Sequence, residues 1–191
     1  MKHPLAAALT VFMMGVLVTQ ASGQSAEEWF LRGNDLSRQG QFEDAVEAYQ
    51  KSLKSDPAST VATYNLGIAH KNLRQYEKAA QAFKKVAEME PGNLDAQLSL
   101  GNAYNFLERW EDAIGPLNIV IHRRQNDAEA HGNLGWAYYN YDKGPPFKIL
   151  VILNLSKAVK LFKEQNNPRA AEATEKILNE ALKKFATQLK H

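Results

Sequence analysis

Residues 60–93 read TVATYNLGIAHKNLRQYEKAAQAFKKVAEMEPGN, and the segments on either side repeat the pattern of this stretch every 34 residues. Small residues and large apolar residues recur at fixed places in each copy. They are the glycines Gly33, Gly67, Gly101 and Gly135, the alanines Ala45, Ala79 and Ala113, and the large residues Phe42, Tyr76, Trp110, Tyr49, Phe83 and Leu117. Because several independent positions coincide at one spacing, the chain is predicted to be an array of similar units.

The kinds of residue that recur indicate paired helices. Gly and Ala let two helices cross closely, while the large residues fill the space beside each crossing. Pro57 and Pro91 stand at the end of a unit, where proline stops a helix because it lacks the backbone N–H that the helix uses. One pair of helices cannot bury its apolar face alone, so successive pairs are expected to stack.

The repeat resembles the tetratricopeptide repeat (TPR) family, whose units are helix-turn-helix pairs of this length. The first unit carries the family's Trp, Gly, Ala, aromatic and Pro residues, at Trp29, Gly33, Ala45, Tyr49 and Pro57. The resemblance implies an all-α fold, a helix-turn-helix superhelix. Its TPR array over 26–166 is expected to hold about four units, at residues 26–59, 60–93, 94–127 and an irregular 128–166.

The fourth unit departs from the pattern after Tyr141. Its second helix aligns with its predecessors only if about four extra residues are allowed, and Val151, Leu155 and Ala158 then take the packing positions. The run 147–155 is apolar almost all the way round. A helix of that composition needs cover on two sides.

Three interpretations of the run 147–155 are open. In the first, a C-terminal capping helix within 167–191, capped by Asn167, covers the run with a stripe made of Ala173, Ile177, Ala181, Phe185 and Leu189. In the second, part of the run is exposed and binds a partner or a second copy of the chain. In the third, residues 149–153 form a β-strand, although the repeat favours a helix.

Residues 1–23 are predicted to be a signal peptide. Lys2 gives a positive start, and the uncharged stretch from Leu5 to Val18 is shorter than the roughly 20 residues that span a bilayer. Small residues favour cleavage after Ala21 or Gly23. We therefore expect a periplasmic or secreted protein whose mature form does not span a membrane. The alternative is an uncleaved segment that anchors the protein to the inner membrane.

Composition narrows the classes of function. The chain has 191 residues, a formal net charge of +2 and no cysteine. Near neutrality gives no strong attraction to nucleic acid, and the lack of cysteine excludes disulfides, thiol nucleophiles and cysteine-ligated metals. No two histidines stand at the i, i+4 spacing, and no phosphate-binding glycine loop or serine elbow is present. We predict that the protein is not an enzyme, uses no cofactor or metal, and binds no nucleic acid.

In the TPR family, the first helices of successive units line a concave groove that usually holds a peptide or a partner's helix. The resemblance places mostly amide and aromatic side chains there. The predicted groove residues are Phe30, Asn34, Tyr64, Asn65, Ile68, Asn72, Leu98, Asn102, Asn105, Trp136, Tyr139 and Asn140, with Arg38, Ser99, Phe106 and Asn133 beside them. Amides can pair with a peptide backbone, and aromatic rings supply apolar contact area. The alternative is that these amides bond local backbone, and that Trp136 and Tyr139 pack against the fourth unit.

One subtype of the family grips a C-terminal carboxylate with two asparagines and several basic residues. Asn34 and Asn65 match the asparagines, but Phe30, Asp95 and Ser99 stand where the basic residues belong. The carboxylate clamp is therefore absent, and a free C-terminal carboxylate is not the expected ligand.

The expected function is that of an exported TPR adaptor or scaffold, a non-catalytic protein-interaction module. Its groove is expected to hold a segment of an envelope protein and so to assist complex assembly. The alternative is a structural scaffold that self-associates through its apolar fourth unit.

Overall fold

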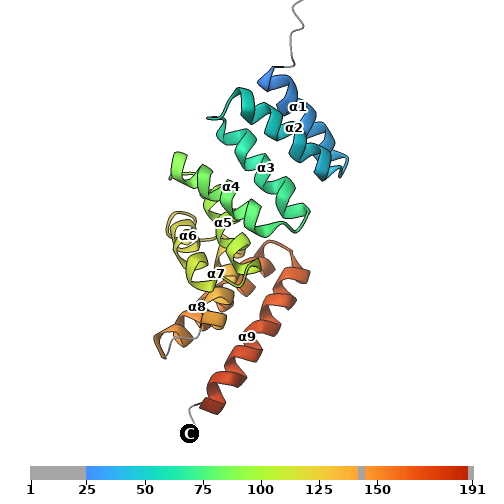
Figure 1. Ribbon diagram of the computed structural model, residues 1–191. Coiled ribbons are helices and arrows are strands. Elements are labelled where there is room, and N and C mark those ends of the chain that lie inside the picture. Colours follow the sequence, from blue (N-terminus) through green and yellow to red (C-terminus); the bar gives the residue numbers. More distant parts are fainter. Residues whose placement is uncertain (1–24, 142–144, 189–191) are drawn as a thin grey trace, which may run out of the picture.

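The computed structural model describes residues 25–141 and 145–188, and every regular element within these ranges is an α-helix (Figure 1). The predicted all-α fold is therefore confirmed, while the predicted signal peptide, residues 1–23, lies outside the described residues. The described helices are α1 (Ala26–Arg38), α2 (Phe42–Ser55), α3 (Thr60–Asn72), α4 (Tyr76–Met89), α5 (Leu94–Phe106), α6 (Trp110–Arg123), α7 (Ala128–Tyr141), α8 (Pro145–Glu164) and α9 (Pro168–Gln188).

The first helix of each unit begins just after a capping residue. Side-chain oxygens of Ser25, Ser59, Asn93 and Asp127 accept hydrogen bonds of 2.9 to 3.2 Å from backbone N–H groups three residues further on. Each such cap stabilises a helix by about 1 kcal/mol because it satisfies a donor that the helix leaves unpaired. Asn167 caps α9 in the same way, as predicted, at 3.2 Å.

The two helices of each unit cross at a glycine. A Cβ atom on these glycines would lie only 2.5 to 2.7 Å from a large side chain of the second helix, the pairs being Gly33 with Tyr49, Gly67 with Phe83, Gly101 with Leu117, and Gly135 with Leu155. Only glycine permits so close a crossing. The pairing of Gly135 with Leu155 confirms the register predicted for the fourth unit with its extra residues.

The units stack in chain order into a curved array (Figure 1). Helices adjacent in the chain pack on one another, and in addition the first helices touch, α1 with α3 and α5 with α7. Neighbours on the inner side of a curve are closer than those on the outer side, so the first helices line the concave side. This is the predicted superhelix.

α8 decides between the three interpretations of the run 147–155. The run is helical, so it is not a strand. Val151 and Leu155 are buried in one core with residues of α7 and α9, whereas Ile149 and Leu153 are 63% and 59% exposed. The capping helix therefore covers one part of the run and leaves an apolar strip exposed.

α9 buries a different stripe from the one predicted. Ala173 is exposed, and Ala171 and Thr174 are buried in its place. Thr174 tolerates burial because its hydroxyl donates to the carbonyl oxygen of Ala170 at 2.8 Å. Leu189 lies outside the described residues, and the rest of the predicted stripe packs on the core: Ile177, Ala181 and Phe185.

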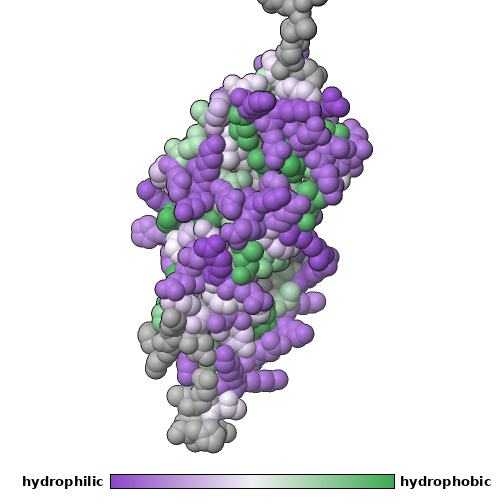
Figure 2. Space-filling model, viewed as in Figure 1, coloured by the Kyte–Doolittle hydropathy of each residue, from purple (hydrophilic) through white to green (hydrophobic). Residues whose placement is uncertain are grey.

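The face of the molecule drawn in Figure 2 is largely hydrophilic, with apolar side chains in scattered patches. None of the helices within the described ranges combines the length and the apolarity that crossing a membrane requires.

Candidate functional site

Two hollows of similar size gather many of the predicted groove residues. The first, here called the N-terminal hollow, has a volume of about 360 Å³ and is lined by Asn34, Ser37, Arg38, Tyr49, Asn65 and Ile68 of α1, α2 and α3. The second, here called the C-terminal pocket, has a volume of about 370 Å³ and lies between α5, α7, α8 and α9. Its lining residues are Asn102, Asn105, Phe106, Glu129, Gly132, Asn133, Trp136, Leu155, Phe162, Ala170, Ala173, Thr174 and Ile177.

The same repeat positions line both hollows. Moving two 34-residue units along the chain converts five residues of the N-terminal hollow into five of the C-terminal pocket. The pairs are Asn34 and Asn102, Ser37 and Asn105, Arg38 and Phe106, Asn65 and Asn133, and Ile68 and Trp136. The two hollows are thus equivalent positions of the repeat array that are lined by partly different residues.

In the N-terminal hollow the polar groups bond one another. The Oδ1 atom of Asn34 accepts from the hydroxyl of Tyr49 at 2.8 Å and from Nδ2 of Asn65 at 2.9 Å. Burial raises the pKa of Tyr49, so its phenol stays protonated and donates. The guanidinium of Arg38 pairs with Asp35 at 2.8 Å. The two asparagines are therefore engaged inside the protein.

In the C-terminal pocket two amide atoms have no partner. Asn105 is only 7% exposed, and its Nδ2 donates to the main-chain oxygen of Asn133 at 2.9 Å. Its Oδ1 and the Nδ2 of Asn133 are both buried and make no hydrogen bond. Buried polar atoms are nearly always paired, and each unpaired one costs about 1–3 kcal/mol. Two lining residues of the pocket thus carry one acceptor and one donor that the protein leaves unused.

Aromatic side chains form the walls beside these amides. Phe106 is 55% exposed and stacks on Tyr76 with ring centroids 4.4 Å apart. Trp136 meets Trp110 edge-on at 6.2 Å between centroids. Because each ring is held by another ring, the walls are preformed rather than assembled around a ligand.

Glu129 is the one charged residue in the lining of the pocket. Its carboxylate accepts from Nδ2 of Asn102 at 3.2 Å. Within residues 25–141 and 145–188, no group of three or more His, Asp or Glu side chains is arranged to hold a metal ion. The lining is mainly apolar, with one carboxylate and two amide atoms that have no partner within the protein.

Part of the pocket was not predicted from the sequence. Glu129 and Gly132 of α7 line the pocket without having been predicted. α8 and α9 supply one further wall, made of Leu155, Phe162, Ala170, Ala173, Thr174 and Ile177. This wall exists because α9 contacts α7 as well as α8. The exposure of Ala173, which the stripe prediction placed in the core, follows from its position at the mouth of this pocket.

Six predicted groove residues line neither hollow: Phe30, Tyr64, Asn72, Leu98, Tyr139 and Asn140. The amides of Asn72 and Asn140 donate to main-chain oxygens one turn earlier, at 2.9 and 2.8 Å. Tyr139 packs against Phe185 of α9. For these three residues, the arrangement is the local bonding and packing that the sequence left as the alternative.

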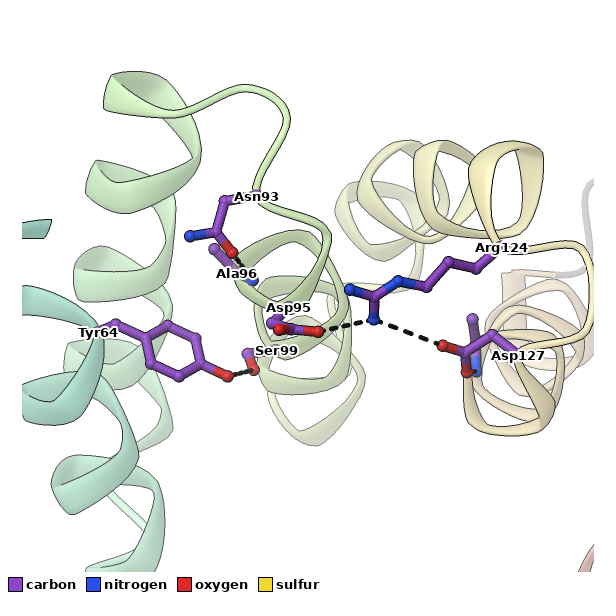
Figure 3. Close-up of polar contacts among 8 residues, drawn as sticks. Tyr64, Asn93, Asp95, Ala96, Ser99, Arg124 and Asp127 are labelled. Carbon is purple, nitrogen blue, oxygen red and sulfur yellow. Dashed lines mark hydrogen bonds and ion pairs between the residues drawn. The ribbon is translucent and has the colours of Figure 1, made fainter. Parts of the chain in front are cut away.

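Two of the three positions that would be basic in a carboxylate clamp, Asp95 and Ser99, form polar contacts within the protein (Figure 3). Asp95 accepts from the guanidinium of Arg124 at 2.7 Å, and the hydroxyls of Ser99 and Tyr64 lie 3.1 Å apart. The hydrogen bond to Asp95 raises the pKa of Arg124, which therefore stays charged and paired. The remaining position is Phe30, so none of the three presents a cation to a carboxylate.

Two models of the tetratricopeptide repeat match this chain, over residues 30–93 and 73–137. Together they cover more than half of its length. No curated protein matches it significantly.

Several solved structures have the same fold. MamA (residues 41 to the end) from Desulfovibrio magneticus RS-1 is 21% identical, with a TM-score of 0.67 over 86% of this chain and 98% of its own. YrrB, described as a TPR protein with an unusual peptide-binding site, is 22% identical, with a TM-score of 0.59 over 82% of this chain and 86% of its own.

The first TPR domain of Spaghetti (RPAP3), bound to the HSP90 peptide SRMEEVD, is 23% identical, with a TM-score of 0.56 over 59% of this chain and 89% of its own. At these identities the likeness shows the fold alone. The repeat register, the glycine crossings and the matches to the family models lead to the same conclusion: the chain belongs to the tetratricopeptide repeat family.

Proposed function

We propose that this protein is an exported, non-catalytic adaptor that holds an extended peptide segment of another exported or envelope protein in its concave groove and so assists complex assembly. The observation that carries the proposal is the unpartnered pair in the C-terminal pocket, Asn105 Oδ1 and Asn133 Nδ2. Every peptide residue other than proline offers one N–H and one C=O. An extended segment therefore supplies both of the missing partners.

The fold supports a protein or peptide partner. TPR arrays are interaction scaffolds, and two of the similar structures, YrrB and RPAP3, are described with a peptide-binding site or a bound peptide. The peptide bound by RPAP3 ends in EEVD, and three of these four residues are acidic. Because Phe30, Asp95 and Ser99 replace the cations of a carboxylate clamp, we assign a different ligand class to this groove, one that is not acidic and not read by its C-terminus.

The test is binding of the full chain to an array of short peptides drawn from exported proteins. Replacing Asn102 and Trp136 together with alanine should abolish capture without lowering helicity in circular dichroism. The matched control is Ile149→Ala with Leu153→Ala, two exposed residues of α8 outside the groove, which should bind as the wild type does. Capture that survives the Asn102 and Trp136 substitutions would place the binding site elsewhere.

Export has its own test. Mass spectrometry of the protein recovered from the exported fraction should find a mature chain that begins at Ser22 or Gln24, as cleavage after Ala21 or Gly23 requires. A chain that keeps Met1 and stays with the membrane fraction would support the anchored alternative instead.

A second candidate function is a self-associating scaffold, and the exposed strip of α8 favours it. Ile149 and Leu153 lie one helical turn apart on the exposed side of α8. In sedimentation over a concentration series, self-association would appear as a rising mass that Ile149→Lys with Leu153→Lys abolishes. A mass that stays that of a monomer would remove this candidate.

A further inference from the structure

We propose that the C-terminal pocket takes a single large apolar side chain of the partner peptide, of the Phe or Leu class, and that α9 makes the site selective for it. The proposal rests on the proposed function and deepens it. It names the residue of the partner that anchors the peptide, and it gives the capping helix a role in recognition besides covering the core.

The size of the pocket fits one side chain. Its volume of about 370 Å³ lies near the lower end of the range of small-ligand pockets, about 300–1,000 Å³. An α-helix with its side chains is about 10–12 Å across, too wide for such a space. A whole partner helix is therefore excluded from the pocket, while one residue of an extended segment can enter it.

The unpartnered amides fit the backbone of that same residue. Because both atoms are buried in the absence of a ligand, the two side chains must turn toward the anchor, and Asn105 Oδ1 then accepts from its N–H while Asn133 Nδ2 donates to its C=O. The remaining hydrogen-bonding group of Asn105 is already used, because its Nδ2 donates to the main chain of α7. The pocket can therefore satisfy one acceptor and one donor, which is what a single peptide residue carries.

The walls select an apolar side chain over a polar one. Phe106, Trp136 and Ile177 offer apolar faces, and the hydroxyl of Thr174 is satisfied by the carbonyl of Ala170 at 2.8 Å. With the two unpaired amide atoms taken by the main chain of the anchor, a polar side chain would lose its water without gaining a partner from Phe106, Trp136 or Ile177. The one charge in the lining is the carboxylate of Glu129, so acidic residues beside the anchor are repelled and basic or neutral ones are accepted.

α9 leaves the space that the anchor fills. Its residues at the mouth are the small Ala170 and Ala173, the latter exposed although it belongs to an otherwise packed helix. A large side chain at Ala173 would occupy the pocket without entering the core. This position therefore separates the role of α9 in recognition from its role in stability.

The experiment uses the full chain, labelled with ¹⁵N, and single capped residues as probes. N-acetyl-phenylalaninamide carries both main-chain groups and the predicted anchor, and N-acetyl-glycinamide carries the main-chain groups alone. The phenylalanine probe should shift the side-chain amide signals of Asn105 and Asn133 and the indole signal of Trp136, saturably and at least tenfold more tightly than the glycine probe. Equal affinity for the two probes would overturn the proposal.

Ala173→Phe supplies the blocking variant, and Ala186→Phe is its matched control. Both put the same side chain at an exposed alanine of α9, and only the first lies at the pocket. Ala173→Phe should weaken the phenylalanine probe at least tenfold, whereas Ala186→Phe should leave its affinity unchanged. An affinity unaltered in Ala173→Phe would overturn the role assigned to α9.

The two proposals fail in different ways. If peptides selected from the peptide array bind to the wild type and to Ala173→Phe equally well, the groove still binds peptides, but the C-terminal pocket does not hold an anchoring side chain. If the phenylalanine probe binds but no array peptide does, the pocket takes an apolar residue and the adaptor function is wrong.

Discussion

The N-terminal hollow and the C-terminal pocket are the same site of the TPR array, two units apart and nearly equal in volume, about 360 and 370 Å³. In the first, Asn34 and Asn65 bond each other, and neither side chain has a buried atom without a partner. In the second, their counterparts Asn102 and Asn133 do not meet, and buried amide atoms are left over. The type of residue in a groove therefore says less about binding than whether its polar atoms are already paired.

Two substitutions and one helix account for the difference. Asn105 stands where the first hollow has Ser37, and it uses the main chain of Asn133 as an acceptor. Phe106 replaces Arg38 and turns a charged rim into an apolar one. α9 then adds a wall that the N-terminal hollow lacks.

The largest loss of peptide binding is expected when the C-terminal pocket is given the residues of the N-terminal hollow. Asn105→Ser with Phe106→Arg removes an acceptor and an apolar wall, and we expect peptide affinity to fall about a hundredfold, from one lost hydrogen bond and one lost aromatic contact. Isothermal titration measures this affinity, with a peptide that the wild type captures from the peptide array. The reverse pair, Ser37→Asn with Arg38→Phe, should create no second site because α9 is absent there; the comparison fails if it does.

The helix crossings beneath the two regions, at Gly33 and Gly135, are expected to be equally important for stability. A Cβ on Gly33 would lie 2.6 Å from Tyr49, and one on Gly135 would lie 2.7 Å from Leu155. Gly33→Ala and Gly135→Ala should each lower the free energy of unfolding by roughly 2 kcal/mol, because a buried side chain must shift. Urea denaturation measures both. A marked effect at one glycine and none at the other would show that the two crossings are not equivalent.

The next prediction uses one substitution in both regions. Asn65→Leu breaks the hydrogen bond to Asn34 and should lower the free energy of unfolding by about 1 kcal/mol. Asn133→Leu removes a buried Nδ2 that has no partner, so the free energy of unfolding should stay the same or rise by about 1 kcal/mol. If both variants lose stability equally in urea, the difference in pairing between the two sites is not real.

The smallest expected effect is a pH dependence confined to the N-terminal half. Burial lowers the pKa of His70 below 6.5, despite a 2.8 Å hydrogen bond to Gln75. Between pH 6.5 and the lower pKa of His70 in the folded protein, the unfolded chain binds more protons than the folded chain. The contribution of neutral His70 to the free energy of unfolding is therefore complete above about pH 6.5 and is lost as the pH falls through the pKa of the folded protein. Urea midpoints should decline on acidification, less so in His70→Gln. The pocket lining has no histidine, so affinity for a neutral peptide should not follow this decline.

Most of the fold could be predicted from the repeat, because the residues that fix each helix crossing stand at a constant spacing along the chain. The crossings at Gly33 and Gly135 depend on a spacing that can be read along the chain, and so does the shifted register of Leu155. The buried stripe predicted for α9 was wrong at Ala173, because alanine is equally suited to a core and to the rim of a pocket. Only the packing of α9 against α7 distinguishes the two.

The site could be predicted only in part. The positions of Asn102, Asn105 and Trp136 in the groove follow from the repeat, but the pairing of their polar atoms does not. Asn34 and Asn105 are alike as residues, and which of them is satisfied depends on distances between helices from different units. For the same reason, no local pattern indicated that α8 and α9 would close the pocket.

Whether the unpaired amide of Asn133 serves a ligand is tested by the dissociation constant of a peptide selected from the peptide array, for the wild type and for Asn133→Leu, measured together with the free energy of unfolding of both proteins. We expect at least tenfold weaker binding in a variant that is as stable as the wild type or more so, since the amide serves the ligand rather than the fold. Unchanged affinity, or weaker binding that is matched by a loss of stability, would contradict it.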